Sequence, residues 1–351
     1  MNDNFTYREI HRQPEIWRGA LAALAAAQNE HRSLLREYRD HLWVFTGCGT
    51  SFYLAQTAAA LFSELTGLRS KAVPASEILI YPELVFNPHE RTLAVAFSRS
   101  GTTTEIVRAV EKTRDELGIP VLSISCDPAS PLALAGEHHV TFPFPTEQSV
   151  VMTGSFTTML LSLVQTALQG RELTEPAALL EQLPAAAAAV LHLADALLPG
   201  ITARAFSQFV FLAQGPFYGL ANEAALKMNE MSLSASRSFH ALEYRHGPMS
   251  TTTTETLITL LASEKGLCYE LQMAADMKKL GAQILLLHDR SLTQVPAEVD
   301  FDLCVPGPGG DLANALVYMP VLQLLGYYNA LQRNQNPDQP HNLSAVVKLE
   351  I

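Results

Sequence analysis

The two halves of the sequence repeat one order of apolar and glycine-rich segments. Residues 42–61 consist of an apolar run, a glycine turn and an alanine-rich stretch, and residues 208–226, which begin 166 positions later, have the same order. Each is typical of a buried strand, a turn and a helix. Three further blocks correspond in the same order, namely 75–78 with 241–244, 91–97 with 256–262, and 117–124 with 280–287. The matched blocks indicate a duplicated structural unit.

The short apolar runs alternate with longer stretches of helical character. Such alternation predicts βαβ units, which form a parallel sheet covered by helices on both faces. We therefore predict an α/β fold that contains two doubly wound parallel-sheet domains. Each domain is expected to be a flavodoxin-like or Rossmann-like three-layer sandwich, related to the other by internal duplication.

The length of 351 residues fits two such domains with connecting segments. Ile10, Trp17, Leu21 and Leu24 have near-helical spacing, which predicts an N-terminal helical arm. A later stretch is rich in Ala, Leu and Pro and is typical of linking helices. The predicted segments are the arm 1–38, a first domain 39–170, linking helices 171–200, a second domain 201–335 and a tail 336–351.

Composition excludes several classes of protein. Apolar residues make up 48% of the chain and its net charge is −11, which argues against intrinsic disorder and against a general nucleic-acid binder. The four cysteines form no CxxC pair, so neither a disulfide framework nor a zinc cluster is indicated. The N-terminus does not resemble a signal peptide, and the most apolar segment, 185–198, is too short to span a bilayer. We expect a soluble cytoplasmic protein without a membrane partner.

Hydroxyl side chains gather at two turns of the first half. Ser98, Ser100 and Thr103 precede a predicted helix, and Thr50 and Ser51 follow the first predicted strand. A helix N-terminus with added hydroxyl donors suits a phosphate group, although a plain Ser/Thr-rich turn with a helix cap has the same composition. The carboxyl ends of neighbouring parallel strands lie at one edge of a sheet, so the two turns could converge there.

The corresponding turn of the second half is different. Residues 263–270 have lost most of the hydroxyl groups and gained an acid. The sequence therefore predicts a phosphate site in the first half alone. A dinucleotide site is disfavoured, because the glycines at 47 and 49 lack the third glycine and the ribose-binding acid of that fingerprint.

A stripe of charged residues marks the second half. Glu223, Lys227 and Glu230 share one face of a predicted helix whose other positions are apolar or small. Glu223 and Lys227 alone could form a solvated ion pair. The helix follows the strand that should carry a ligand loop, which favours a role in acid–base chemistry.

His246 stands in a polar, turn-forming segment. A single loop histidine is often structural, but the nearby carboxylates, the lysine and the phosphate loop favour a functional role. His138 and His139 have no partner spacing and are interpreted as surface or core residues.

Together these motifs resemble the SIS (sugar isomerase) domain family over nearly the whole chain. The double layout is similar to the isomerase half of glucosamine-6-phosphate synthases (glutamine:fructose-6-phosphate amidotransferases). IHRQPEIW at 10–17 and MTGSFTT at 152–158 are more similar to the tagatose-6-phosphate ketose/aldose isomerase group. The five blocks shared with the family are TGCGTS at 46–51, SRSGTT at 98–103, NEAALKMNE at 222–230, RHGP at 245–248 and DQPHNL at 338–343.

The resemblance implies a role for each motif. Glu230 would be the base for proton transfer, with Glu223 and Lys227 beside it. His246 would open the sugar ring and would come from the neighbouring subunit, which implies a homodimer. The phosphate would be held by Thr50, Ser51, Ser98, Ser100 and Thr103, with possible further substrate contacts from Gly49, Arg99, Thr153 and Ser155.

Three departures from the family pattern qualify this picture. The chain starts at Met1-Asn2, without the glutaminase domain or N-terminal cysteine of the synthases, so no hydrolysis of glutamine is expected. Ala345 stands at the position of the tail lysine that forms a Schiff base in the synthases, and Lys348 lies three residues further on. Met152 stands at a phosphate-loop serine, for which Thr153 or Ser155 could substitute.

The expected function is that of an amino-sugar 6-phosphate deaminase and isomerase, which interconverts aldose and ketose through an enediol or enolamine. This chemistry requires no metal and no organic cofactor. Alternatives within enzymes are a fructosamine-6-phosphate deglycase and a plain ketose/aldose phosphate isomerase. A sugar-phosphate-binding regulator without catalysis is an alternative of another class, disfavoured by the intact charged stripe and by the lack of space for a helix-turn-helix before the first strand.

Overall fold

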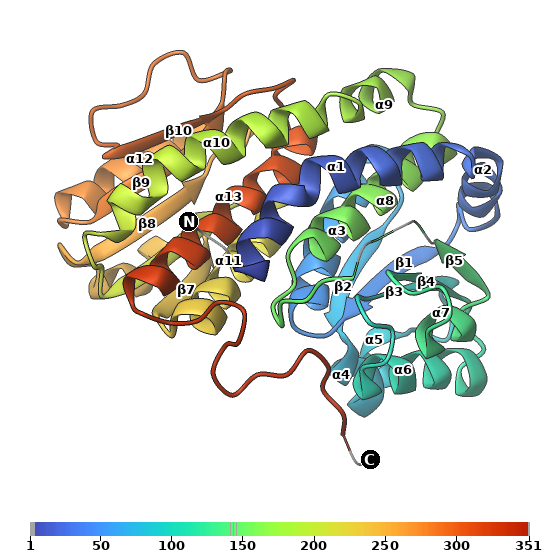
Figure 1. Cartoon of the computed structure of the whole chain (residues 1–351). Coiled ribbons are helices and arrows are strands. Elements are labelled where there is room, and N and C mark those ends of the chain that lie inside the picture. Colours follow the sequence, from blue (N-terminus) through green and yellow to red (C-terminus); the bar gives the residue numbers. More distant parts are fainter. Residues whose placement is uncertain (1–3, 141, 143, 145, 350–351) are drawn as a thin grey trace. The chain divides into compact units, whose positions relative to one another are not determined.

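The computed structural model describes residues 4–140, 142, 144 and 146–349 (Figure 1). The chain divides into two compact units, each made of three separate segments. Unit 1 comprises Met1–Pro14, Gln148–Thr153 and Gln182–Leu343, and unit 2 comprises Glu15–Glu147, Gly154–Glu181 and Ser344–Ile351. The first residues of the predicted arm, 1–3, and the last of the predicted tail, 350–351, lie outside the described residues.

Unit 2 contains a parallel five-stranded sheet with the order β2-β1-β3-β4-β5. The central strands β1 and β3 are buried along their whole length, as the apolar runs predict. They pair directly, with Thr46 opposite Ala96. The strands are β1 Leu42–Gly47, β2 Ser70–Pro74, β3 Thr92–Ser98, β4 Val121–Ser125 and β5 His138–Val140.

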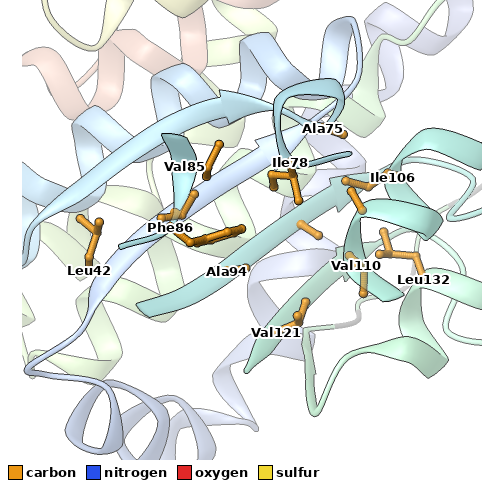
Figure 2. Packing of buried hydrophobic residues seen from close by; sticks show 13 residues of the cluster. Leu42, Ala75, Ile78, Val85, Phe86, Ala94, Ile106, Val110, Val121 and Leu132 are labelled. Carbon is orange, nitrogen blue, oxygen red and sulfur yellow. The ribbon is translucent and has the colours of Figure 1, made fainter. Parts of the chain in front are cut away.

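Helices cover both faces of this sheet. Val44 and Ala94 face a cluster that includes Ile78 and Ile106, which come from two helices on one side (Figure 2). On the other side, Trp43 packs against Phe62 of the helix α3, with the two rings tilted by 34°. The helices of the first half are α1 Phe5–Ala25, α2 Gln28–Glu37, α3 Thr50–Thr66, α4 Ala75–Ile80, α5 Pro82–Val85, α6 Thr104–Glu111 with a π-helical turn Lys112–Glu116, α7 Pro131–Ala135, α8 Gly154–Gly170 and α9 Thr174–Leu180.

Unit 1 repeats the same topology. Its parallel sheet has the order β10-β9-β8-β6-β7, which is the order of the first sheet read from the other edge. This confirms the predicted duplication. The elements are β6 Gln208–Ala213, β7 Ala235–His240, β8 Thr256–Leu261, β9 Gln283–Asp289 and β10 Phe301–Val305, with helices α10 Leu183–Thr202, α11 Phe217–Ser232, α12 Leu267–Lys279 and α13 Asp311–Gln332 and 3-10 turns Glu243–Arg245 and Pro248–Thr251.

Helix α10 is longer than the apolar segment 185–198 suggests. It has 20 residues, so by length and composition it could cross a membrane, and the expectation that it is too short is wrong. Its Asp195 accepts hydrogen bonds from the hydroxyls of Tyr7 at 3.0 Å and Tyr328 at 2.8 Å, and lies 2.9 Å from Nε2 of His11. A buried face and a partnered carboxylate are typical of a core helix in a globular protein.

Candidate active site

The hydroxyl-rich turns of the first half lie at the point where the strand order of unit 2 reverses. Ser98 ends β3, while Thr50 and Ser51 begin α3 directly after β1. Because β1 and β3 are adjacent and parallel, both turns lie at the same edge of the sheet. The structure therefore brings together the two turns that the sequence predicts to converge.

The turn after β3 is held by its own serines. The backbone N–H of Gly101 donates to Ser98 Oγ at 3.0 Å, and the N–H of Thr102 donates to Ser100 Oγ at 3.2 Å. Each serine oxygen thus acts as an acceptor within the turn, and its own hydrogen can be donated to an anion. Gly101 has φ +62°, and a Cβ there would overlap with Ser130 Oγ, so the turn requires glycine.

Helix α6 begins at this turn. Thr103 is its N-cap, with an extended backbone and no capping bond from its side chain to the described residues. The C-terminal tail lies against the same helix end, because the N–H of Thr104 donates to the carbonyl of Val347 at 3.4 Å and the N–H of Leu349 donates to Thr104 Oγ1 at 3.1 Å. The sequence pattern does not predict where this tail lies, and the structure shows it beside the hydroxyl-rich turn that precedes α6.

Arg99 and Ser155 are joined by a carboxylate that the sequence motifs do not include. Glu147 Oε2 lies 3.0 Å from Arg99 Nη1, and Glu147 also accepts the N–H and the hydroxyl of Ser155, at 2.9 and 2.8 Å. A second Arg99 nitrogen donates to the carbonyl of Ala345 at 3.2 Å. Glu147 therefore holds the side chains of Arg99 and Ser155, two of the residues predicted as possible substrate contacts, in place. Thr153 belongs to unit 1, where its carbonyl accepts a hydrogen bond from Gln323 at 3.0 Å.

The turn after β1 contains a cysteine between two glycines. Gly49 is the N-cap of α3 and has φ +53°, a conformation that favours glycine. Burial raises the pKa of the Cys48 thiol to about 12, with a further increase from Glu105. The Cys48 thiol is therefore protonated at neutral pH, the less reactive form of a cysteine.

The charged stripe of the second half is buried in unit 1. Glu223 and Lys227 are fully buried, and Lys227 Nζ lies 3.2 Å from Glu223 Oε1. The same ammonium group also binds Glu230 Oε2, and the Glu230 side chain is 19% exposed. The alternative of a solvated ion pair is therefore wrong. Of the three, Glu230 alone opens to solvent.

Close packing explains how three charges come to lie inside. Gly326 of α13 faces α11, where a Cβ would lie 2.6 Å from the end of Met231 and 3.4 Å from the Lys227 carbonyl. Asn329 of α13 donates to Ser232 Oγ at 2.8 Å. Helix α13 thus covers α11 at the level of the lysine, a contact that periodicity in α11 alone cannot reveal.

The charge state of Lys227 follows from its two partners. Burial lowers the pKa of the ammonium group, but the Glu223 and Glu230 carboxylates raise it by more, so the pKa is above its ordinary value. Lys227 is therefore a permanent cation beside Glu230. It can stabilise negative charge, and because its pKa is raised it does not act as a neutral amine.

His246 occupies an exposed position in the turn after β7. Its backbone N–H donates to the Glu243 carbonyl at 3.0 Å, and its neighbour Arg245 lies 2.7 Å from Asp276. Gly247 has φ +117°, which a side chain would disfavour. The turn therefore presents the imidazole to solvent, and no described contact joins it to the stripe on α11.

The matching turn of the second half holds a carboxylate of the protein itself. Glu270 is fully buried and accepts the N–H of Ser263 at 2.8 Å and its hydroxyl at 2.7 Å. The N–H of Glu264 donates to Asp311 at 2.7 Å. These donors are therefore used within the protein, a role of the acid that the sequence did not predict. Among the described residues, no group of three or more His, Cys, Asp or Glu is placed to hold a metal.

Comparison with known proteins gives matches over the whole chain. Residues 39–169 match the family model described as SIS domain. The glutamine–fructose-6-phosphate aminotransferase (isomerizing) of Gloeobacter violaceus is 29% identical over 99% of this chain. The solved glucosamine-6-phosphate deaminase of Thermotoga maritima is 29% identical, with a TM-score of 0.81, and covers 99% of this chain and 100% of its own. The solved tagatose-6-phosphate ketose/aldose isomerase of Escherichia coli is 22% identical and has a TM-score of 0.85. The match covers 99% of this chain and 97% of the isomerase chain.

These matches confirm the family resemblance and the fold. The relatives include both groups that the motifs resemble, and the solved structures share the two-sheet architecture. The chain spans 59% of the length of the aminotransferase that it matches.

Proposed function

We propose that this protein, in which residues 39–169 match the SIS domain model, is an amino-sugar 6-phosphate deaminase and isomerase. The observation that carries the proposal is the buried Glu223–Lys227–Glu230 stripe, in which one carboxylate opens to solvent beside a fixed cation. The names of the deaminase and isomerase relatives support the substrate class.

In this proposal the turns of unit 2 bind the phosphate group. Ser98, Ser100 and Thr103 supply hydroxyls at the start of α6, and Thr50 and Ser51 supply them at the start of α3. Two helix N-termini and several hydroxyl donors suit a dianion. Holding the phosphate away from the reacting carbons provides binding energy that orients the sugar.

Glu230 is proposed as the base. It takes the proton from the carbon that bears nitrogen, C2 of an aldose, and returns it at C1. In the same conversion the nitrogen loses one proton and the aldehyde oxygen gains one, so that C1 becomes CH2OH and C2 becomes an imine. Water then adds to C2 and ammonia leaves, which gives the ketose phosphate. Lys227 stabilises the negative charge that develops on oxygen during proton transfer.

His246 is proposed to open the sugar ring before proton transfer. Its exposed position in unit 1 suits a residue that serves a neighbouring subunit, as the family resemblance implies, so we propose a homodimer. His246→Asn should slow turnover of the cyclic sugar, and sedimentation velocity should show a dimer. A monomer with full activity would contradict this part of the proposal.

The test is release of ammonia from glucosamine 6-phosphate, galactosamine 6-phosphate and a fructosamine 6-phosphate, measured with the wild type, Glu230→Gln and Glu255→Gln. Glu255 is exposed and serves as the matched control. Release that is lost with Glu230→Gln and retained with Glu255→Gln is expected for one of these sugars. Release from the fructosamine alone would identify a deglycase.

Two other outcomes would replace the proposal. Ketose formation from aldose phosphates without release of ammonia would indicate a plain isomerase. Binding of the same sugars without any turnover would indicate a regulator.

A further inference from the structure

Four arginines line one hollow in unit 2. The hollow has a volume of about 330 Å³ and lies between α2, the segment after α3 and the end of α8. Its guanidinium groups come from Arg32, Arg36, Arg39 and Arg171. The protein as a whole has a net charge of −11, so this is a local concentration of positive charge on an acidic molecule.

Ion pairs within the protein neutralise only part of the positive charge of these four arginines. One acid, Glu172, lines the hollow, 3.2 Å from Arg32 Nε, and Arg39 Nε lies 3.4 Å from the exposed Asp40. Arg36 and Arg171 form no ion pair with the described residues. Arg32 and Arg36 are one helical turn apart, and like charges at this spacing destabilise a helix. The arginines of the hollow therefore carry more positive charge than the neighbouring carboxylates neutralise.

The floor of the hollow is apolar and closely packed. Leu35 and Leu68 line it together with Gly170, the last residue of α8. A Cβ at Gly170 would lie 2.6 Å from Leu35 Cδ2, so glycine is needed for α8 to approach α2 this closely. The four arginines thus line a concave surface, which a flat patch of exposed arginines would lack.

We propose that this hollow binds a small molecule with two or more linked phosphate groups. A guanidinium group can donate two hydrogen bonds to one phosphate, so four arginines supply donors for more than one phosphate group. The dimensions suit a small ligand, because the hollow is too small for a folded partner.

This site is separate from the phosphate-binding turns. Helix α3 starts at Thr50, beside those turns, and ends before Leu68, beside the hollow. Its 17 residues span about 25 Å. One rigid helix therefore leads from the proposed diphosphate site to the proposed substrate phosphate site.

The test is titration calorimetry of the full chain, in buffer without phosphate, with pyrophosphate, inorganic phosphate and citrate as probes. Pyrophosphate is expected to bind at least tenfold more tightly than the other two, and more weakly as salt is added. Arg36→Gln with Arg171→Gln should weaken pyrophosphate binding at least tenfold. The control with the same change in charge is Arg18→Gln with Arg237→Gln, two exposed arginines outside the hollow.

Three results would overturn the proposal. Pyrophosphate binding could be unchanged by the double substitution, or it could fall equally in the control. Citrate could bind as tightly as pyrophosphate, which would indicate only a general attraction of anions. Each result is independent of ammonia release, so the proposed enzymatic function and the diphosphate site can fail separately.

Discussion

Lys227 Nζ lies 3.2 Å from Glu223 Oε1, and both side chains are fully buried. A buried ion pair has lost its hydration, so each charge depends on the other. This dependence makes α11 sensitive to single substitutions.

Lys227→Met should lower the free energy of unfolding by about 3–5 kcal/mol, because it leaves two carboxylates without their cation. Denaturation by urea measures the loss. Combining Lys227→Met with Glu223→Gln should restore part of the stability, because the stranded charge is removed as well. An unchanged unfolding midpoint for Lys227→Met would show that the pair is not buried in solution.

Gly101→Ala should weaken binding of sugar phosphate much more than Gly118→Ala. Both glycines have a left-handed backbone, with φ +62° and +65°, so either substitution costs about 1–2 kcal/mol of stability. Only the Cβ at Gly101 would overlap with Ser130, whereas nothing lies within 4 Å at Gly118. Calorimetric titration with glucosamine 6-phosphate compares them. Equal affinities would mean that the Ser98–Thr103 turn does not hold phosphate.

Glu270 should make the protein less stable as the pH rises toward neutrality. Burial raises the pKa of this carboxyl to about 7, despite the lowering effect of the hydrogen bonds from Ser263. Between the ordinary value and about 7 the native state holds a proton that the unfolded state has lost, so stability falls by about 3 kcal/mol over this range and is constant above it. Glu270→Gln should lack this fall. Parallel curves for the two proteins between pH 5 and 8 would contradict the assignment.

Asp289 should have the opposite effect at acid pH. Burial would raise the pKa of its carboxyl, but hydrogen bonds from Ser291, Gly310 and Asn314 lower it to about 2. The lowered pKa contributes about 2 kcal/mol to the free energy of unfolding. This contribution is fully present at pH values above the pKa of the unfolded state, and it is lost as the pH falls through the pKa of the folded state. Asp289→Asn should remove this contribution at neutral pH and flatten the acid limb of the unfolding curve. A steep acid limb in the variant would assign that limb to other carboxyls.

The sequence predicted those parts of the site that depend on local pattern. The hydroxyl turns lie at strand ends because buried apolar runs and glycines define those ends, and Glu223, Lys227 and Glu230 share a face because of helical spacing. The edge strands β2 and β7 were not predicted, since they are partly exposed and lack an apolar run.

Contacts between distant residues could not be predicted in this way. Glu147 binds Arg99, 48 residues away, and the tail contacts Thr104 across more than 240 residues. No periodicity marks either contact. The burial of Lys227 likewise depends on Gly326 of another helix. The role of Glu270 in 263–270 is evident only from its hydrogen bond with Ser263 in the structure.

The division of each unit into three segments affects how the protein can be made. A ribosome delivers residues in order, and domains built from one continuous stretch can fold before synthesis ends. Here unit 1 needs residues as late as Leu343 and unit 2 needs residues from Ser344 onward. Neither unit is complete until the last part of the chain has emerged. The strands and helices of unit 2 are all translated by Leu180 and can pack early, whereas the N-terminal segment of unit 1 must wait for the second sheet and helix α13.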